Sequence, residues 1–256
     1  MTLSHALVLI LTGIAGGTIS SLVGGAALVT YPVLLAAGIP PVIATVCNLV
    51  ALSPSNLLAA LYDRGQLPPF NRSFVALVIA SSVGALAGAL VLLRTPKHMF
   101  EVLVPILLGF ATVLFAYAGR ISAFLRARAG DNDKNPHRWS NSIGVILPVS
   151  FYGGYFGAGV GVLLLGVLSI GTPGDYRAAN VTKNLVTSLN SLAAAAVFIA
   201  QGAVLWPPTL VMMVGALIGA IIGARLAQIA PHGLMRVVVV AVGALLTVVF
   251  AWRYWF

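Results

Sequence analysis

The chain has 256 residues, of which 60% are hydrophobic and 7% are charged, with a mean hydropathy of +1.04 and a net charge of +9. Soluble domains are about half apolar and about a quarter charged, so this composition excludes a soluble protein and predicts an integral membrane protein. The basic residues are scattered between apolar runs and form no common face, which excludes nucleic acid as a partner. They are better explained as topology signals, because Lys and Arg favour cytoplasmic loops.

The apolar runs are long and do not alternate as the strands of a transmembrane barrel do, so they predict membrane helices and an all-α fold. Six of them have about the 20 residues that a helix needs to cross a bilayer. The first and the fifth are more than 30 residues long and contain glycines, so each is expected to be a broken helix or a re-entrant hairpin. The eight segments are 4–37, 42–62, 71–93, 98–119, 142–172, 180–200, 207–224 and 233–252.

The two halves of the chain resemble each other. SSVGALAGALVLLR at 81–94 matches MMVGALIGAIIGAR at 212–225, and LVGGAAL in the first half corresponds to GAGVGVL in the second. Asn48 and Asn184 are each followed by Leu-Val. Such repeats are common in transporters, where the substrate lies at the repeat interface. The sequence therefore predicts a first membrane repeat at 1–119, a polar cytoplasmic linker at 120–141 and a second membrane repeat at 142–256.

The distribution of basic residues predicts the relative orientation of the repeats. If the first and fifth segments return to their own side, eleven of the 14 Lys and Arg residues fall on the linker side, against eight if those segments cross fully. The positive-inside rule favours the first arrangement and hence inverted repeats. Arg177 and Lys183 are also candidate site residues. If they are left out of the count, the preference for inverted repeats is weaker but is not reversed. Parallel repeats remain the alternative.

The glycine breaks are candidate anion sites. A helix that begins inside the membrane presents free N–H groups and the positive end of its dipole, which together bind anions without a cation. Gly24 and Gly25 in the first half, and Gly157, Gly159 and Gly161 in the second, lie where such half-helices would begin. Tight helix packing is the better explanation for one such motif, but duplicated breaks in over-long segments favour binding.

Polar residues follow each break and supply candidate donors. Asn184 and Ser188 share one face of the predicted helix with Asn180. Lys183 corresponds to Cys47 in the first repeat, so the fold does not require it; an anion-binding lysine and a snorkelling surface lysine both remain open. The predicted substrate-binding residues are Gly24, Gly25, Asn48, Gly159, Gly161, Lys183, Asn184 and Ser188, with a second set of Pro32, Thr45, Gly157, Arg177, Asn180 and Thr187.

Several kinds of chemistry are absent from the sequence. None of the five carboxylates lies in the middle of a predicted span, which argues against a cation pathway and against a proton relay built on carboxylates. Arg177 is expected to pair with the nearby Asp175. There is no phosphate-binding loop and no catalytic acid–base pair in the membrane. The sequence therefore predicts no enzyme, no cofactor and no metal site.

LVGGAALVTYPVLLAAGIPPVIAT resembles the glycine-rich signature of the sulfite exporter TauE/SafE family, also called the 4-toluene sulfonate uptake permeases. GYFGAGVGVLLLGVLSIG, RAANVTKN, QGAVLW and GALIGAIIGARLA resemble the C-terminal repeat of that family. Two departures are Gly166, where a proline is common, and Thr182-Lys183-Asn184, near a usual Thr-Ser pair. By analogy the site residues are Gly24, Gly25 and Pro32 in the first half and Gly157, Gly159 and Gly161 in the second.

The resemblance implies a multi-pass transporter in the bacterial inner membrane that carries small sulfur-containing anions such as sulfite, a sulfonate or sulfoacetate. Alternating access between the repeats is the expected mechanism. An anion channel, a non-transporting accessory subunit and a membrane enzyme are the alternatives. The expected partners are a small anion and the lipid bilayer, whereas the choice of anion, the direction of transport, proton coupling and assembly into a homo-oligomer stay open.

Overall fold

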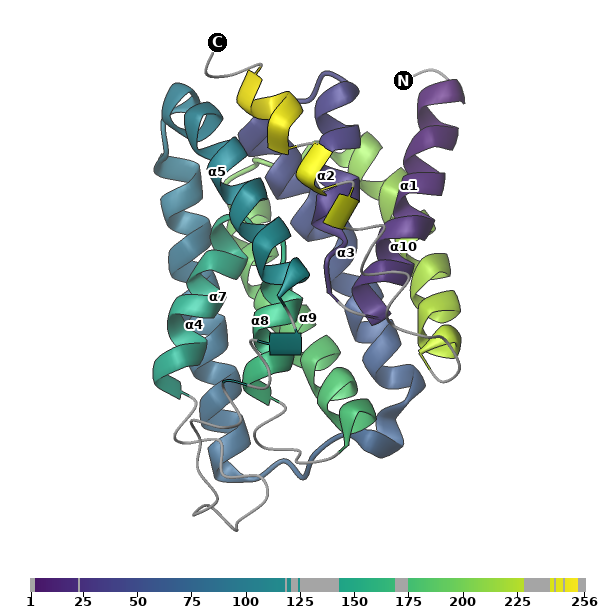
Figure 1. The fold of residues 1–256 in the computed structure, drawn as a ribbon, viewed down its shortest axis with the longest axis vertical. Helices are drawn as coiled ribbons and strands as arrows, with labels where there is room; N and C mark the ends of the chain where they lie inside the picture. The colour runs from purple at the N-terminus through teal and green to yellow at the C-terminus, as the bar shows by residue number, and fades with distance from the viewer. Residues whose placement is uncertain are drawn as a thin grey trace.

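The computed structural model describes residues 3–22, 24–117, 119–120, 124, 143–168, 175–227, 240–241, 243–245 and 247–252. Every regular element in these ranges is a helix, which confirms the all-α prediction (Figure 1). Six of the described helices are long and apolar enough to cross a membrane, as a multi-pass membrane protein requires. They are α1 (Leu3–Leu22), α3 (Pro41–Tyr62), α4 (Arg72–Arg94), α5 (Lys97–Ala116), α9 (Tyr176–Ala200) and α10 (Trp206–Leu226).

The two over-long segments each form two helices. The first divides into α1 and α2 (Ala27–Ala36), and the fifth divides into α7 (Ile143–Tyr155) and α8 (Val160–Leu168). The short helix η1 (Arg64–Gln66) follows α3. Most of the predicted linker at 120–141 and part of the predicted eighth segment at 233–252 lie outside the described residues.

Local sequence signals explain where several helices begin. Pro41 stands at the first position of α3, where the missing N–H of proline costs nothing. Asn71 caps α4 by accepting a hydrogen bond from Phe74 N at 2.8 Å. Asp175 caps α9 in the same way, accepting from Ala178 N at 2.9 Å. These caps satisfy N–H groups that a helix start leaves without an intrahelical partner.

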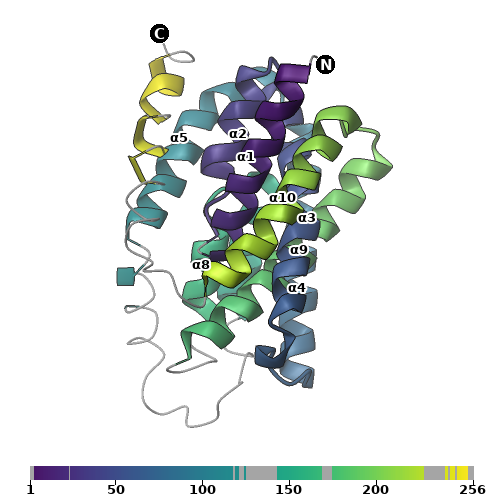
Figure 2. The same ribbon diagram turned by 90° about the vertical axis from the view of Figure 1, so that its right-hand side faces the viewer.

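Glycines bring helices from the two halves into close contact. A Cβ atom added at Gly88 of α4 would lie 2.0 Å from Phe151 O of α7, and one at Gly215 of α10 would lie 2.2 Å from Ile10 O of α1. The matching motifs at 81–94 and 212–225 thus serve the same purpose, because each lets a long helix pack closely against the first helix of the other half. Figure 2 shows α10 beside α1.

The two broken helix pairs enter the helical body from opposite ends. In Figure 1, α1 runs downward from the top and α2 turns back toward the top, whereas α7 rises from the bottom and α8 returns there. Both turns therefore lie inside the body. The long helices α3 and α9 pack against each other, and α9 also packs against α8 and the end of α1.

Candidate functional site

The two glycine breaks touch each other. A Cβ atom added at Gly24 would lie 2.6 Å from Gly161 Cα, and one at Gly161 would lie 2.6 Å from Gly24 Cα. Gly24 also has a φ of +86°, in the left-handed region that other residues rarely adopt. The backbones of the two halves therefore meet at the breaks, and in this state no space separates Gly24 from Gly161.

The other predicted glycines have packing neighbours of their own. Added Cβ atoms would meet the ring of Phe115 at Gly25, the side chain of Leu49 at Gly157 and the backbone of Ala111 at Gly159. Gly157 and Gly159 have φ values of +79° and +77°, as the sharp turn before α8 requires. The structure therefore places Gly24 and Gly161 together, with the remaining three glycines in neighbouring packing contacts.

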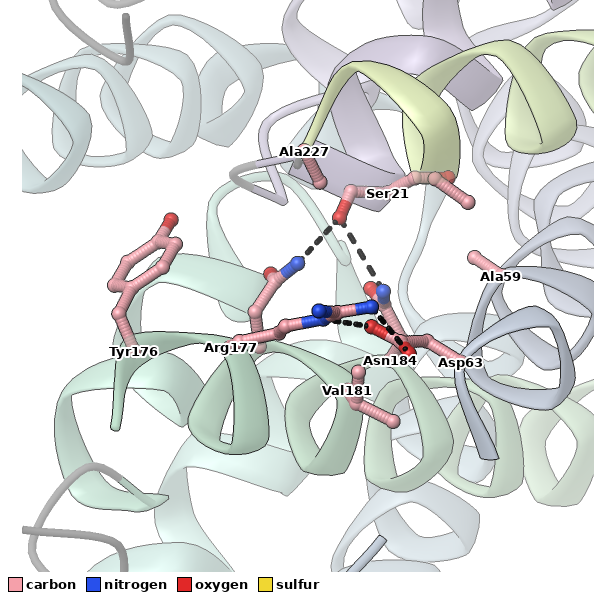
Figure 3. Close-up of a pocket in the computed structure, with 10 residues that line it drawn as sticks. Ser21, Ala59, Asp63, Tyr176, Arg177, Val181, Asn184 and Ala227 are labelled. Atoms are coloured by element: carbon pink, nitrogen blue, oxygen red, sulfur yellow. Dashed lines mark hydrogen bonds and ion pairs between the residues drawn. The ribbon is translucent and has the colours of Figure 1, made fainter. Parts of the chain in front are cut away.

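Donors from α9 meet the carbonyl end of α1. A helix that ends inside the protein leaves its last carbonyl groups without intrahelical partners, and in a membrane each must be satisfied by the protein. Lys183 Nζ donates to Ser20 O at 2.8 Å. Asn180 Nδ2 and Asn184 Nδ2 both donate to Ser21 O, at 3.0 and 3.2 Å, and these two bonds converge in Figure 3.

Lys183 is fully buried, with 0% of its surface exposed, so it is not a snorkelling lysine. Its ammonium lies at the C-terminal end of α1, where the helix dipole favours a cation. The start of its own helix, which disfavours a cation, is seven residues away. Within the described ranges the ion pairs are Lys97–Glu101 and Arg177–Asp63, so no described carboxylate pairs with Lys183. In its protonated form this side chain has three donors, so the one described hydrogen bond leaves two for a ligand.

Three buried acceptor atoms beside this cluster have no hydrogen-bond partner among the described residues. They are Asn180 Oδ1, Asn184 Oδ1 and Thr187 Oγ1. A buried polar atom left without a partner costs about 1–3 kcal/mol. Their position on the face of α9 that carries Asn180 and Asn184 marks a place where water, or a ligand group that donates hydrogen bonds, would be stabilised.

A small pocket opens beside these residues. Its volume of about 20 Å³ is close to that of a single water site, so the pocket must widen before it can hold a polyatomic anion. No group of three His, Cys, Asp or Glu residues that could hold a metal ion occurs in the described part of the chain. The pocket is lined by Ser21, Ala59, Asp63, Tyr176, Arg177, Asn180, Val181, Asn184, Ala224 and Ala227.

Arg177 does not pair as the sequence suggested. Its Nε and Nη2 donate to Asp63 Oδ2 and Oδ1, at 2.5 and 2.8 Å, among the residues that line the pocket (Figure 3). The expected pair with Asp175 is wrong, because Asp175 is engaged as the cap of α9. Asp63 ends α3, which comes from the other half of the chain. Two residues 114 positions apart are therefore tied together beside the buried cluster.

Of the predicted residues, Arg177, Asn180 and Asn184 line the pocket, whereas Lys183 and Thr187 lie beside it on α9 and are not among its lining residues. The other predicted residues make contacts elsewhere. Asn48 accepts a hydrogen bond from Thr30 of α2 at 2.5 Å, so it does not repeat the contacts of Asn184. Thr45 Oγ1 donates to Pro41 O within its own helix, at 3.2 Å. Ser188 Oγ donates to Ser53 O of α3 at 2.9 Å. Pro32 is buried inside α2. The contacts of Asn48 and Ser188 join α3 to its neighbours α2 and α9.

Four residues of the site were not predicted. Ser20 and Ser21 contribute backbone carbonyls, Tyr176 OH donates to Leu22 O at 3.2 Å, and Asp63 holds Arg177. The glycine break itself carried a signal for the serines. A helix that stops near Gly24 must present carbonyls just before it, and those carbonyls need donors. No comparable sequence signal points to Asp63, because its partner is distant in the chain.

Comparison with known proteins gives a consistent picture. The model of the family "Sulfite exporter TauE/SafE" matches residues 9–250. A "Probable membrane transporter protein" of Haemophilus influenzae is 26% identical and covers 94% of this chain and 92% of its own. The "Probable membrane transporter protein ORF9" of Sinorhizobium is 30% identical over 83% of this chain and 79% of its own, and the Escherichia coli protein YfcA, of the same description, is 26% identical over 94% and 87%. No solved structure matches. The chain belongs to the sulfite exporter TauE/SafE family of membrane transporters.

Proposed function

We propose that this protein is a secondary transporter of small sulfur-containing anions, such as sulfite or a sulfonate, across the bacterial inner membrane. The observation that carries the proposal is the buried ammonium of Lys183, which lies at the inner end of a broken helix and has no carboxylate partner in the described part of the chain. An unpaired buried charge is costly, so this position favours an anion. The family to which the chain belongs supports sulfite or a related oxyanion as the substrate.

The donors of the cluster can turn toward an anion without leaving the end of α1 unsatisfied. Ser21 O accepts from two amides, Asn180 and Asn184, so one amide can leave while the other holds the carbonyl. Lys183 can keep its bond to Ser20 O and bind the anion through its two remaining N–H groups. Charge-assisted hydrogen bonds of this kind are about twice as strong as neutral ones.

Alternating access between two inverted repeats is the mechanism we propose. The opposite entry of the two broken helix pairs supports it, since inverted repeats are expected to place equivalent elements at opposite ends. The contact between Gly24 and Gly161 is then the barrier between the pocket and the far side. Movement of one broken pair against the other would open this contact and let the anion pass.

Uptake by the purified protein in proteoliposomes tests the proposal. The panel contains sulfite, thiosulfate, sulfate, sulfoacetate, taurine and acetate, each with and without a pH gradient. We expect saturable uptake of a sulfur oxyanion that counterflow accelerates, as a carrier requires. The response to the gradient shows whether protons move with the anion.

Uptake that does not saturate and shows no counterflow would favour an anion channel. No uptake of any member of the panel by folded protein would contradict the transport of small sulfur anions and would favour an accessory subunit.

A further inference from the structure

The charged residues that line the pocket form one ion pair. Arg177 lies in the first turn of α9, and Asp63 lies at the end of α3. Arg177 donates two parallel hydrogen bonds to Asp63, of 2.5 and 2.8 Å. Both side chains line the pocket with Ser21, Asn180 and Asn184 (Figure 3). The pair therefore lines the same cavity as the two buried asparagines and supplies the charged side chains of that lining.

Arg177 is the first of a series of donors that leads inward along α9. Positions 177, 180 and 184 are spaced three and four residues apart, so they lie on one face of the helix. The side chain of Arg177 is 50% exposed, whereas Asn180 and Asn184 are 5% and 3% exposed. An anion that enters from this side meets the guanidinium first and the buried amides after it.

The carboxylate of Asp63 presents two oxygens to the guanidinium, as a sulfite or sulfonate group would. A guanidinium fork binds two oxygens of one group at once, so Asp63 and such a ligand compete for the same two donors. The pair is partly exposed to solvent, and exposed ion pairs shift an equilibrium by a factor of only about one to five. A free anion can therefore displace Asp63 from Arg177.

We propose that Asp63 is a built-in competitor for the substrate, and that the oxyanion enters by taking its place on Arg177. This inference rests on the proposed function, because it assumes that the pocket receives an oxyanion. Displacement frees the end of α3 from the start of α9 and widens a pocket that is too small for the anion while closed. When the anion leaves, Asp63 returns to Arg177. The exchange selects anions with two oxygens to offer, such as sulfite, over a halide.

Equilibrium binding of sodium sulfite to the purified full-length protein, with sodium chloride as the second probe, tests the inference. Asp63→Asn keeps the size of the side chain and removes its charge. We expect this variant to bind sulfite about 1.4- to fivefold more tightly than the parent protein, because an exposed ion pair of about 0.2–1 kcal/mol no longer competes. Arg177→Lys keeps the positive charge but loses the fork, so it should bind sulfite more weakly and lose preference over chloride.

The matched control is Glu101→Gln, which removes a carboxylate from the 3.8 Å pair with Lys97, away from the pocket. It should leave sulfite binding unchanged. Thermal unfolding of each variant confirms that it is folded. If the parent protein binds sulfite but Asp63→Asn binds it equally or less tightly, Asp63 does not compete and the inference is overturned. If the parent protein binds no sulfite, the proposed function is contradicted, and the inferred competition at Arg177 is contradicted for the same reason.

Discussion

The replacement of Lys183 by methionine tests the proposed role of the buried ammonium. Methionine keeps an unbranched side chain of similar length and removes the charge, so the change should leave the packing around a fully buried position largely intact. The change removes one or two charge-assisted hydrogen bonds to the anion, each worth about 1.5–3 kcal/mol. The loss of one such bond should weaken anion affinity by about 10- to 150-fold.

The protein should survive this change. Ser20 O loses its donor, which costs about 1–3 kcal/mol. The same substitution removes a buried charge that no described carboxylate balances, which offsets part of that cost. We therefore expect a modest change in the temperature of thermal unfolding together with a large loss of anion affinity. Affinity is measured as the half-saturating concentration of sulfite in proteoliposome counterflow.

Arg94→Met is the matched control, because Arg94 is an exposed cation at the end of α4 and the substitution is the same. It should change the half-saturating concentration less than twofold. If Lys183→Met and Arg94→Met have equal effects, or if Lys183→Met lowers the unfolding temperature while sulfite affinity is unchanged, then Lys183 serves only to hold the end of α1. Either result would refute the argument from the buried charge.

Two further predictions concern the break and the cap of α1. Gly24→Ala should lower the unfolding temperature far more than Gly38→Ala. Both residues have positive φ, which costs an alanine about 1–2 kcal/mol, but only an alanine at position 24 would also clash with Gly161. Equal losses of stability would show that the contact between the breaks is loose. Asn180→Ala removes one of the two donors to Ser21 O, so it should cost about 1 kcal/mol of stability. Loss of both donors would leave the carbonyl unsatisfied and should cost up to about 3 kcal/mol. A chemical unfolding series measures the second effect, and a loss as large as that of the double variant with Asn184→Ala would contradict the shared capping.

Much of the fold follows from apolar run length and glycine position. The boundaries of α3, α4 and α10 fall within about two residues of the expected segments, because a bilayer sets the length of a spanning helix. The breaks in the first and fifth segments were also expected, since neither one helix nor two full spans fit their length. The start of α9 was placed at 180 instead of Tyr176, because the capping role of Asp175 was not recognised.

The site was harder to predict, for a physical reason. A helix break creates two ends, but the glycine pattern predicted a role only for the N–H end of the helix that follows it. The structure shows that the carbonyl end of α1 also needs partners, and that Lys183 and two asparagines supply them. The ion pair between Asp63 and Arg177 depends on how α3 and α9 pack, which no local pattern encodes.

The most direct test of the central claim is to locate the bound anion. Selenite resembles sulfite in shape and charge, and selenium scatters X-rays anomalously, so a crystal of the transport-competent protein soaked in selenite would reveal its position. We predict an anomalous peak within hydrogen-bonding reach of Lys183 Nζ, beside the end of α1 and in the widened pocket that Asp63 and Arg177 line. A peak confined to exposed basic residues such as Arg94, under conditions in which selenite is transported and competes with sulfite, would contradict it.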